Sequence, residues 1–220
     1  MEKTHLNLAA IMSLENRKRA HLINACGGFK SVCLIGTKDA NEQRNLAIFS
    51  SVFHIGSMPP LIAFVVRPES VERHTLQNII DTGFYTINHI NESIYKKAHQ
   101  SSARYPKELS EFEALGLSEE YKNNFFAPYV AESNIQMGVQ CRERIDLKIN
   151  GTIIIIGEIQ ELYFPSESWC EDGFLDLEIA GSITCSGLDS YHTTNFLDRL
   201  SYAKPNIPLH SIVNSYNKEM

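Results

Sequence analysis

Short runs of apolar and β-branched residues, separated by polar turns, recur along most of the chain. The Asn-Gly pair at 150–151 lies between two such runs and is the strongest hairpin signal in the sequence. The polar residues 38–44 predict a second hairpin between the first two runs. We expect strands over residues 31–35, 46–54, 61–66, 84–90, 136–149 and 152–164, with a last short strand within 179–186.

Helical patterns are fewer and shorter. Ser13 is expected to cap a helix that runs to about Asn24 and ends at Gly27-Gly28. Residues 74–82 place apolar side chains on one side and are followed by Gly83, which favours a short helix. A third helix is expected from residue 91 or 92 to about 100, and residues 101–124 are polar and irregular.

About six or seven strands with two or three short helices, and no regular alternation of strand and helix, predict a mainly β fold with helical insertions. An antiparallel barrel fits this pattern. We expect a single domain over residues 1–220. A helical and irregular excursion is expected at about 91–134, together with an extended C-terminal tail.

Composition narrows the class of protein. The 220 residues are 43% hydrophobic and 21% charged, which is typical of a folded globular chain, and the net charge of −6 argues against a nucleic-acid partner. The longest unbroken apolar run, residues 61–66, is far shorter than the roughly 20 residues of a membrane helix. The N-terminus does not have the pattern of a signal peptide. Five scattered cysteines without CxxC spacing favour a reducing, cytoplasmic location.

Sequence motifs of several enzyme classes are missing. There is no GxGxxG, GxxxxGK[ST], HExxH or GxSxG pattern. His54, His74, His89 and His99 lack the spacing of metal ligands, so we expect no metal site. The sequence identifies no catalytic side chain.

One polar group of residues remains as a candidate binding site. Asn45, Ser50 and Ser51 lie on or beside one predicted strand, and Arg73-His74-Thr75 begin a predicted helix. A helix N-terminus offers free N–H groups, and a guanidinium and a hydroxyl beside it make a candidate phosphate site. The alternative is that Thr75 only caps the helix and Arg73 is solvated.

An ordered set of short motifs resembles the flavin reductase-like family. Its usual patterns are N-L-A-P-F-S, a strand beginning P-P, K-D-T-x-x-N-I, G-E-F-V-V-N, E-F-x-x-A-G-L, P-x-V-x-E-S and I-G-E-V. The matching segments of this chain are 45–51, 59–61, 73–79, 83–88, 111–117, 128–133 and 156–159. Ile48 stands where the family often has Pro, and Arg73-His74 where it often has Lys-Asp.

The resemblance implies an antiparallel, Greek-key-like, FMN-binding split barrel that forms a homodimer, with the flavin near the subunit interface. It implies a phosphate site around Arg73, His74 and Thr75. If the phosphate lies elsewhere, Arg67 and Lys38 are the next candidates. It also implies that isoalloxazine contacts come from the segment 45–51, that is, from Asn45, Ala47, Ile48, Phe49, Ser50 and Ser51.

The function that follows from this resemblance is an NAD(P)H-dependent flavin reductase. Such an enzyme passes a hydride from NADH or NADPH to flavin N5, and the cofactors carry the chemistry. An FMN-binding redox or sensing protein without efficient nicotinamide turnover is the main alternative. A barrel that binds another small ligand and no flavin is the third.

Overall fold

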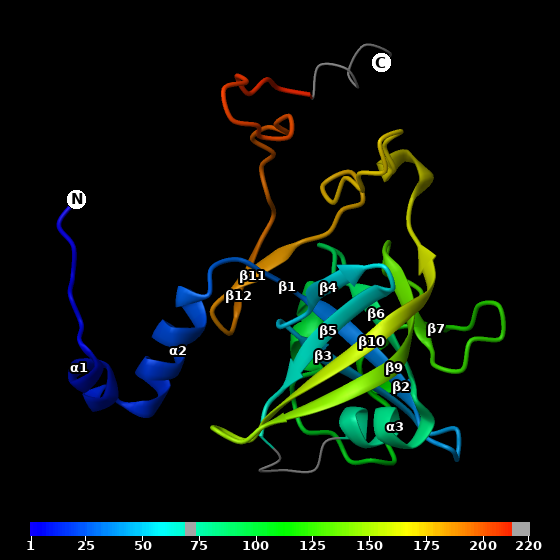
Figure 1. Ribbon diagram of the computed structural model, residues 1–220. Coiled ribbons are helices and arrows are strands. Elements are labelled where there is room, and N and C mark those ends of the chain that lie inside the picture. The colour runs from blue at the N-terminus through cyan, green and yellow to red at the C-terminus, as the bar shows by residue number, and fades with distance from the viewer. Residues whose placement is uncertain (69–73, 213–220) are drawn as a thin grey trace.

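The computed structural model describes residues 1–68 and 74–212 and contains a seven-stranded sheet curved into a barrel (Figure 1). The strand order is β3-β2-β6-β9-β10-β5-β4, and every neighbouring pair is antiparallel. The expected mainly β, antiparallel split-barrel class is confirmed. The strands are β2 (Cys33–Lys38), β3 (Arg44–Phe49), β4 (Phe53–Ser57), β5 (Pro60–Val66), β6 (Phe84–His89), β9 (Gln136–Leu147) and β10 (Thr152–Tyr163).

Two small sheets and several short helices surround this barrel. β1 (Lys30–Ser31), β11 (Thr184–Ser186) and β12 (Ser190–His192) form one small sheet, and β7 (Glu119–Glu120) pairs with β8 (Tyr129–Val130) in the other. Between β6 and β9 the chain leaves the barrel and forms α4, α5, β7 and β8. The helices are α1 (Leu8–Ser13), α2 (Asn16–Cys26), α3 (His74–Thr82), α4 (Tyr95–Gln100), α5 (Glu111–Leu115) and a 3-10 turn at Ser166–Ser168.

The single strand predicted over residues 46–54 is wrong. The segment forms two strands, β3 and β4, which pair with different neighbours: β3 with β2, and β4 with β5. The apolar pattern continues through Val52 into Phe53, but β3 packs on the apolar clusters while most of β4 is exposed. Ser50 to Val52 carry the chain from one sheet edge to the other.

The N-terminal helix also differs from the prediction. Ser13 ends α1 and does not cap the following helix. The Glu15 carboxylate caps α2 and accepts hydrogen bonds from the N–H groups of Arg17 and Lys18, each at 3.0 Å. These two hydrogen bonds lower the pKa of Glu15. The predicted end at Gly27-Gly28 is confirmed, as are α3 and the hairpin turn at Asn150-Gly151.

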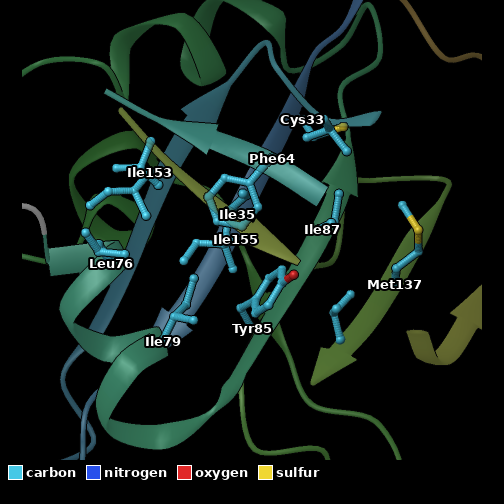
Figure 2. Packing of buried hydrophobic residues seen from close by; sticks show 13 residues of the cluster. Cys33, Ile35, Phe64, Leu76, Ile79, Tyr85, Ile87, Met137, Ile153 and Ile155 are labelled. Carbon is cyan, nitrogen blue, oxygen red and sulfur yellow. The ribbon is translucent and has the colours of Figure 1, made fainter. Parts of the chain in front are cut away.

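β2 is buried on both faces and separates two apolar clusters. Cys33 and Ile35 point into the barrel, where Phe64 and Tyr85 pack in edge-to-face contact with ring centroids 5.6 Å apart (Figure 2). Leu34 points to the opposite face, into a second cluster with residues of α4 and α5. The second cluster comprises Val32, Leu34, Leu46, Ile90, Ile94, Ala98, Phe112, Leu117, Val130 and Cys185.

The two ends of the chain extend away from the barrel (Figure 1). Neither α1 nor α2 contains a buried residue. Large apolar side chains are exposed along both ends; among them are Leu8, Met12, Ile23, Phe29, Phe196, Leu197, Leu200, Tyr202, Ile207 and Leu209. Among residues 1–68 and 74–212, no helix has the length and apolar character to cross a bilayer.

Candidate functional site

Residues 45–51 lie at one edge of the barrel sheet and then leave it. β3 forms one edge and β4, the next strand in the chain, forms the other. The connection from Phe49 to Phe53 therefore crosses the opening between the two edges, which is the split of the barrel. An edge strand has backbone N–H and C=O groups that no neighbouring strand uses.

The direction of these backbone groups follows from one hydrogen bond. The N–H of Leu46 points away from β2 and donates to Glu111 Oε2 at 2.9 Å. In an antiparallel pair, the N–H and C=O of one residue point to the same side, and the side alternates along the strand. Ile48, two residues further on, therefore also directs its N–H and C=O away from β2, toward the split.

The side chains of β3 alternate between the two apolar clusters. Phe49 packs on the barrel core, with its ring centroid 4.9 Å from that of Phe64, and Ile48 packs on the second cluster. Ala47 is half-buried. The ring of Phe53, which begins β4, is 40% exposed and is the aromatic surface available at the split.

The two adjacent serines have different surroundings. Ser51 Oγ donates to the carbonyl of Val65 at 3.0 Å and accepts from the N–H of Val65 at 3.2 Å. Its hydroxyl therefore acts as a strand partner for β5. Ser50 is half-buried and lies beside the thiol of Cys185, whose pKa is raised by burial.

Asn45 and Thr75, both expected at the site, bond to each other. Asn45 Nδ2 donates to Thr75 Oγ1 at 2.8 Å and to Thr37 Oγ1 at 3.4 Å. Asn78 Nδ2 donates to the same Thr37 oxygen at 3.1 Å. All four side chains are buried. This network fixes the first turn of α3 against β2 and β3.

The cationic residues expected to hold a phosphate differ in their exposure to solvent. Arg73 is outside the described residues. His74, the first residue of α3, is half-buried, and Arg67 is exposed after β5. Lys38 is buried, its Nζ donates to Glu42 Oε2 at 2.6 Å, and it lies 4.5 Å from the ring centroid of Phe126. Since Lys38 is already neutralised, it is the weaker of the two reserve candidates.

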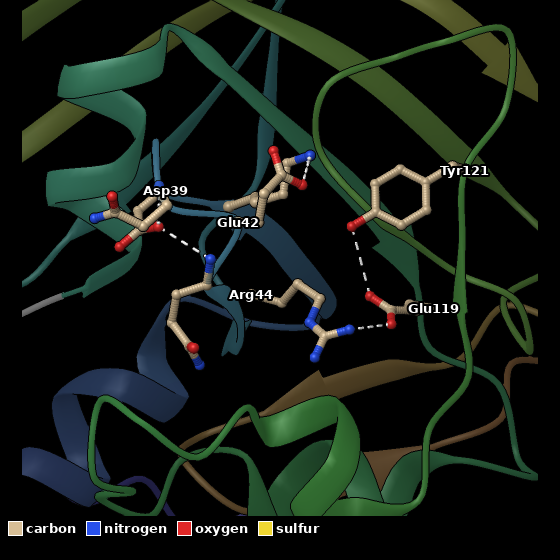
Figure 3. Close-up of polar contacts among 8 residues, drawn as sticks. Asp39, Glu42, Arg44, Glu119 and Tyr121 are labelled. Carbon is tan, nitrogen blue, oxygen red and sulfur yellow. Dashed lines mark hydrogen bonds and ion pairs between the residues drawn. The ribbon is translucent and has the colours of Figure 1, made fainter.

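A small cavity lies between the β2–β3 turn, the start of α3 and the start of α5. Charges of both signs line it, and Lys107 Nζ is 3.7 Å from Asp39 Oδ2. Arg44, also in the lining, donates from Nη1 to Glu119 at 2.5 Å (Figure 3). Its lining residues are Asp39, Gln43, Arg44, Asn45, His74, Asn78, Lys107, Leu109 and Glu111. The cavity has no excess of positive charge and does not by itself form an anion site.

Glu111 is the functional candidate that the sequence reading missed. In the sequence, Glu111 stands out only as part of the family motif at 111–117. An acidic residue directly after Ser110 is also what the first turn of any helix favours, so it gives no separate signal of function. In the structure its carboxylate is buried beside β3. Burial raises the pKa of Glu111, and the hydrogen bond from Leu46 and the nearby His74 oppose that rise.

A larger, open hollow of about 720 Å³ lies on another side of the molecule, and none of the predicted site residues lines it. Its walls are polar and include Asn91, Glu132, Asn134, Glu178 and Ser182.

Within the part of the chain that the structure describes, no three His, Cys, Asp or Glu side chains are grouped so as to hold a metal ion.

Comparison with solved structures supports the same fold. A protein from Shewanella frigidimarina, assigned as a flavin reductase with a split barrel domain, is 49% identical. The match covers 91% of this chain and 100% of that one, with a TM-score of 0.89. Component B of nitrilotriacetate monooxygenase from Bacillus cereus shares the fold at 20% identity, with a TM-score of 0.79 and coverage of 91% and 100%.

Sequence comparison identifies the family. An uncharacterised protein of Deinococcus radiodurans is 27% identical over 221 residues, which cover 93% of each chain. The profile of the flavin reductase like domain matches residues 29–175, a span that contains all seven strands of the barrel. The chain therefore belongs to the flavin reductase-like family.

Proposed function

We propose that this protein binds FMN at the split of the barrel and acts as an NAD(P)H-dependent flavin reductase. The observation that carries the proposal is that β3 lies at an edge of the sheet with no strand on its outer side and continues into the connection at residues 50–51, in a member of a flavin reductase family. The proposal goes beyond family membership in two respects: the flavin is FMN, and the reductant is NADH or NADPH.

The residues at the split fit the polar edge of an isoalloxazine ring. That edge needs hydrogen-bond donors for its carbonyl oxygens and an acceptor for its ring N–H. The outward N–H and C=O of Ile48 supply one of each. The Ser50 hydroxyl, which contacts the Cys185 thiol, is a further polar group of the same segment. Phe53 provides an exposed aromatic surface at the same opening. Ser51 takes part through the backbone, since its hydroxyl holds Val65.

The phosphate of FMN fits best at the start of α3. Its two negative charges need compensation in a chain of net charge −6. We assign that role to Arg73, His74 and the N-terminus of α3, with Arg67 in reserve. Thr75 supports the site by holding the turn in place through Asn45.

The chain's own part in the reaction is binding and orientation. A bound flavin supplies the electron-transfer chemistry. The edge of β3 orients the ring, and the barrel core behind Phe49 keeps water from its inner side. No acid or base is assigned.

We also propose that the protein is a homodimer in the cytoplasm. The helices α1 and α2 have no buried residue, and the C-terminal tail exposes many large apolar side chains. Apolar surface of this extent normally marks an interface. A second copy of the chain is the occupant that the family resemblance implies. Light scattering at micromolar concentration is expected to give twice the 24.9 kDa chain mass.

The proposed cytoplasmic location has separate support. The five cysteines are all free thiols, which fits a reducing compartment.

An anaerobic titration tests the function. The purified protein is expected to bind FMN and to show the visible absorbance band of oxidised flavin. NADH or NADPH is expected to bleach that band with enzyme-dependent kinetics. If the protein binds FMN but NADH and NADPH do not bleach its absorbance, the result would favour a redox or sensing protein. Failure to bind FMN, FAD or riboflavin would instead favour a barrel for another ligand.

A further inference from the structure

We propose that Glu111 is a positioning residue that holds the flavin-binding edge of β3 in place. This inference rests on the proposed function, because it assigns a role relative to the flavin. The starting observation is that the Leu46 N–H, on the unpaired side of β3, donates to a side chain and not to another strand.

The carboxylate takes the place of a missing neighbouring strand at one point. The donor and acceptor atoms, Leu46 N and Glu111 Oε2, are 2.9 Å apart, and both residues are buried. A buried backbone N–H without a partner costs free energy, so the strand is most stable where Leu46 reaches the Glu111 carboxylate. The contact therefore sets the position of β3 relative to α5. Ile48 lies on the same side two residues further on, at roughly 6.8 Å along the strand. A change in strand position at Leu46 is therefore passed directly to the Ile48 N–H and C=O.

Glu111 is itself rigidly held. It is the first residue of α5, whose start is capped by Ser110 Oγ and whose end is Gly116, with a φ of +59°. The next residue, Phe112, packs in the same apolar cluster as Leu46. The helix and the strand therefore share one core, and the carboxylate cannot move away without disrupting that core.

Charged and titratable groups face Glu111 from each neighbouring element. His74 begins α3, Arg44 and Asp39 belong to the β2–β3 hairpin, and Lys107 lies on the approach to α5. The hydrogen bond from Leu46 needs only an acceptor oxygen. The assigned role therefore depends on a side-chain oxygen at position 111 and on the length of the side chain that carries it. A glutamine, which is neutral and of the same length, preserves this role.

Three substitutions separate positioning from other roles. Glu111→Gln keeps an acceptor at the same distance, Glu111→Asp keeps the charge but shortens the side chain, and Glu111→Ala removes the acceptor. The matched control is Glu113→Ala, since Glu113 lies exposed on the same helix. FMN affinity is measured by quenching of flavin fluorescence, and exchange of the amides in residues 44–49 is measured by hydrogen–deuterium exchange without flavin.

We expect Glu111→Ala and Glu111→Asp to weaken FMN binding about tenfold and to speed exchange in this segment by a similar factor. Glu111→Gln and Glu113→Ala are expected to match the wild type in both measurements. If Glu111→Ala does not fold, the Asp and Gln pair gives the same comparison. Unchanged affinity in the Ala or Asp variants, or equal loss in the Gln variant, would overturn the assignment.

The wild-type protein serves as the check on the proposed function. If it binds no flavin, the proposed function fails, whatever the substitutions do. If it binds FMN and the variants do not follow the expected order, only the role of Glu111 fails. Faster amide exchange in Glu111→Ala with unchanged FMN affinity would show a purely structural contact and would also overturn the proposal.

Discussion

The side-chain amide of Asn45 on β3 donates to the hydroxyl of Thr75 on α3, with 2.8 Å between Nδ2 and Oγ1. Both residues are buried, and this bond connects the strand proposed to hold the flavin ring with the helix proposed to hold its phosphate. The two ends of the proposed FMN site are therefore coupled through the protein interior.

Replacing Thr75 by Val is expected to lower the free energy of unfolding by about 1–3 kcal/mol, because the Asn45 amide loses its nearer acceptor in a buried site. FMN affinity should fall as well, since the first turn of α3 is less firmly held. Thr75→Ser keeps the hydroxyl and serves as the control. Urea denaturation measures stability. A Val variant as stable as the wild type would contradict the buried-network interpretation.

The phosphate assignment is tested by comparing FMN with riboflavin, which lacks the phosphate. Arg73→Ala is expected to weaken FMN binding about tenfold to a hundredfold, the loss of one charge-assisted hydrogen bond of roughly 1.5–3 kcal/mol. Riboflavin should bind the variant and the wild type almost equally. An equal loss for both ligands would make Arg73 structural and point to Arg67 for the phosphate.

The adjacent serines are expected to respond differently to replacement by Ala. Ser51→Ala removes the hydroxyl that bonds both backbone groups of Val65, so it should reduce stability by about 1–2 kcal/mol along with FMN affinity. Ser50→Ala should reduce FMN affinity with little effect on stability. Thermal unfolding without flavin, together with flavin titration, separates the two effects. Equal behaviour of both variants would count against this placement of the ring.

Stability is expected to fall as the pH is lowered from 6.5 toward 4, in part because of His89. Burial lowers the pKa of His89 from its ordinary value of 6.5 to about 4, and its Nδ1 lies 2.9 Å from Ser182 Oγ. Between pH 6.5 and 4, His89 therefore binds a proton in the unfolded chain but not in the folded chain, and protonation favours unfolding. Above pH 6.5, His89 does not change the free energy of unfolding. The loss is at most about 3 kcal/mol.

Denaturation curves at a series of pH values measure this effect. His89→Asn removes the titrating group and should flatten the pH dependence between 6.5 and 4. His54→Asn, at an exposed position on β4, is the control and should leave the curve unchanged. If the His89→Asn variant loses as much stability on acidification as the wild type, His89 is not the cause.

Elements with local signals can be predicted from the amino-acid sequence. The helix at residues 74–82 and the hairpin at Asn150-Gly151 agree with the structure because periodicity and turn residues act over a few positions. The barrel class followed from the number and spacing of the apolar runs. Asn45, Ser50 and Ser51 are candidates because they are polar residues on or beside one predicted strand, and the family motif adds the rest of the segment 45–51.

The contacts that these residues make depend on how the chain folds in three dimensions. Residues 46–54 look like one strand, and their division into β3 and β4 depends on pairing with two strands at opposite edges of the sheet. Asn45 and Thr75 are 30 positions apart, and Leu46 and Glu111 are 65 apart. Hydrogen bonds over such separations are fixed by chain topology and burial, which a local pattern of apolar and polar residues does not encode.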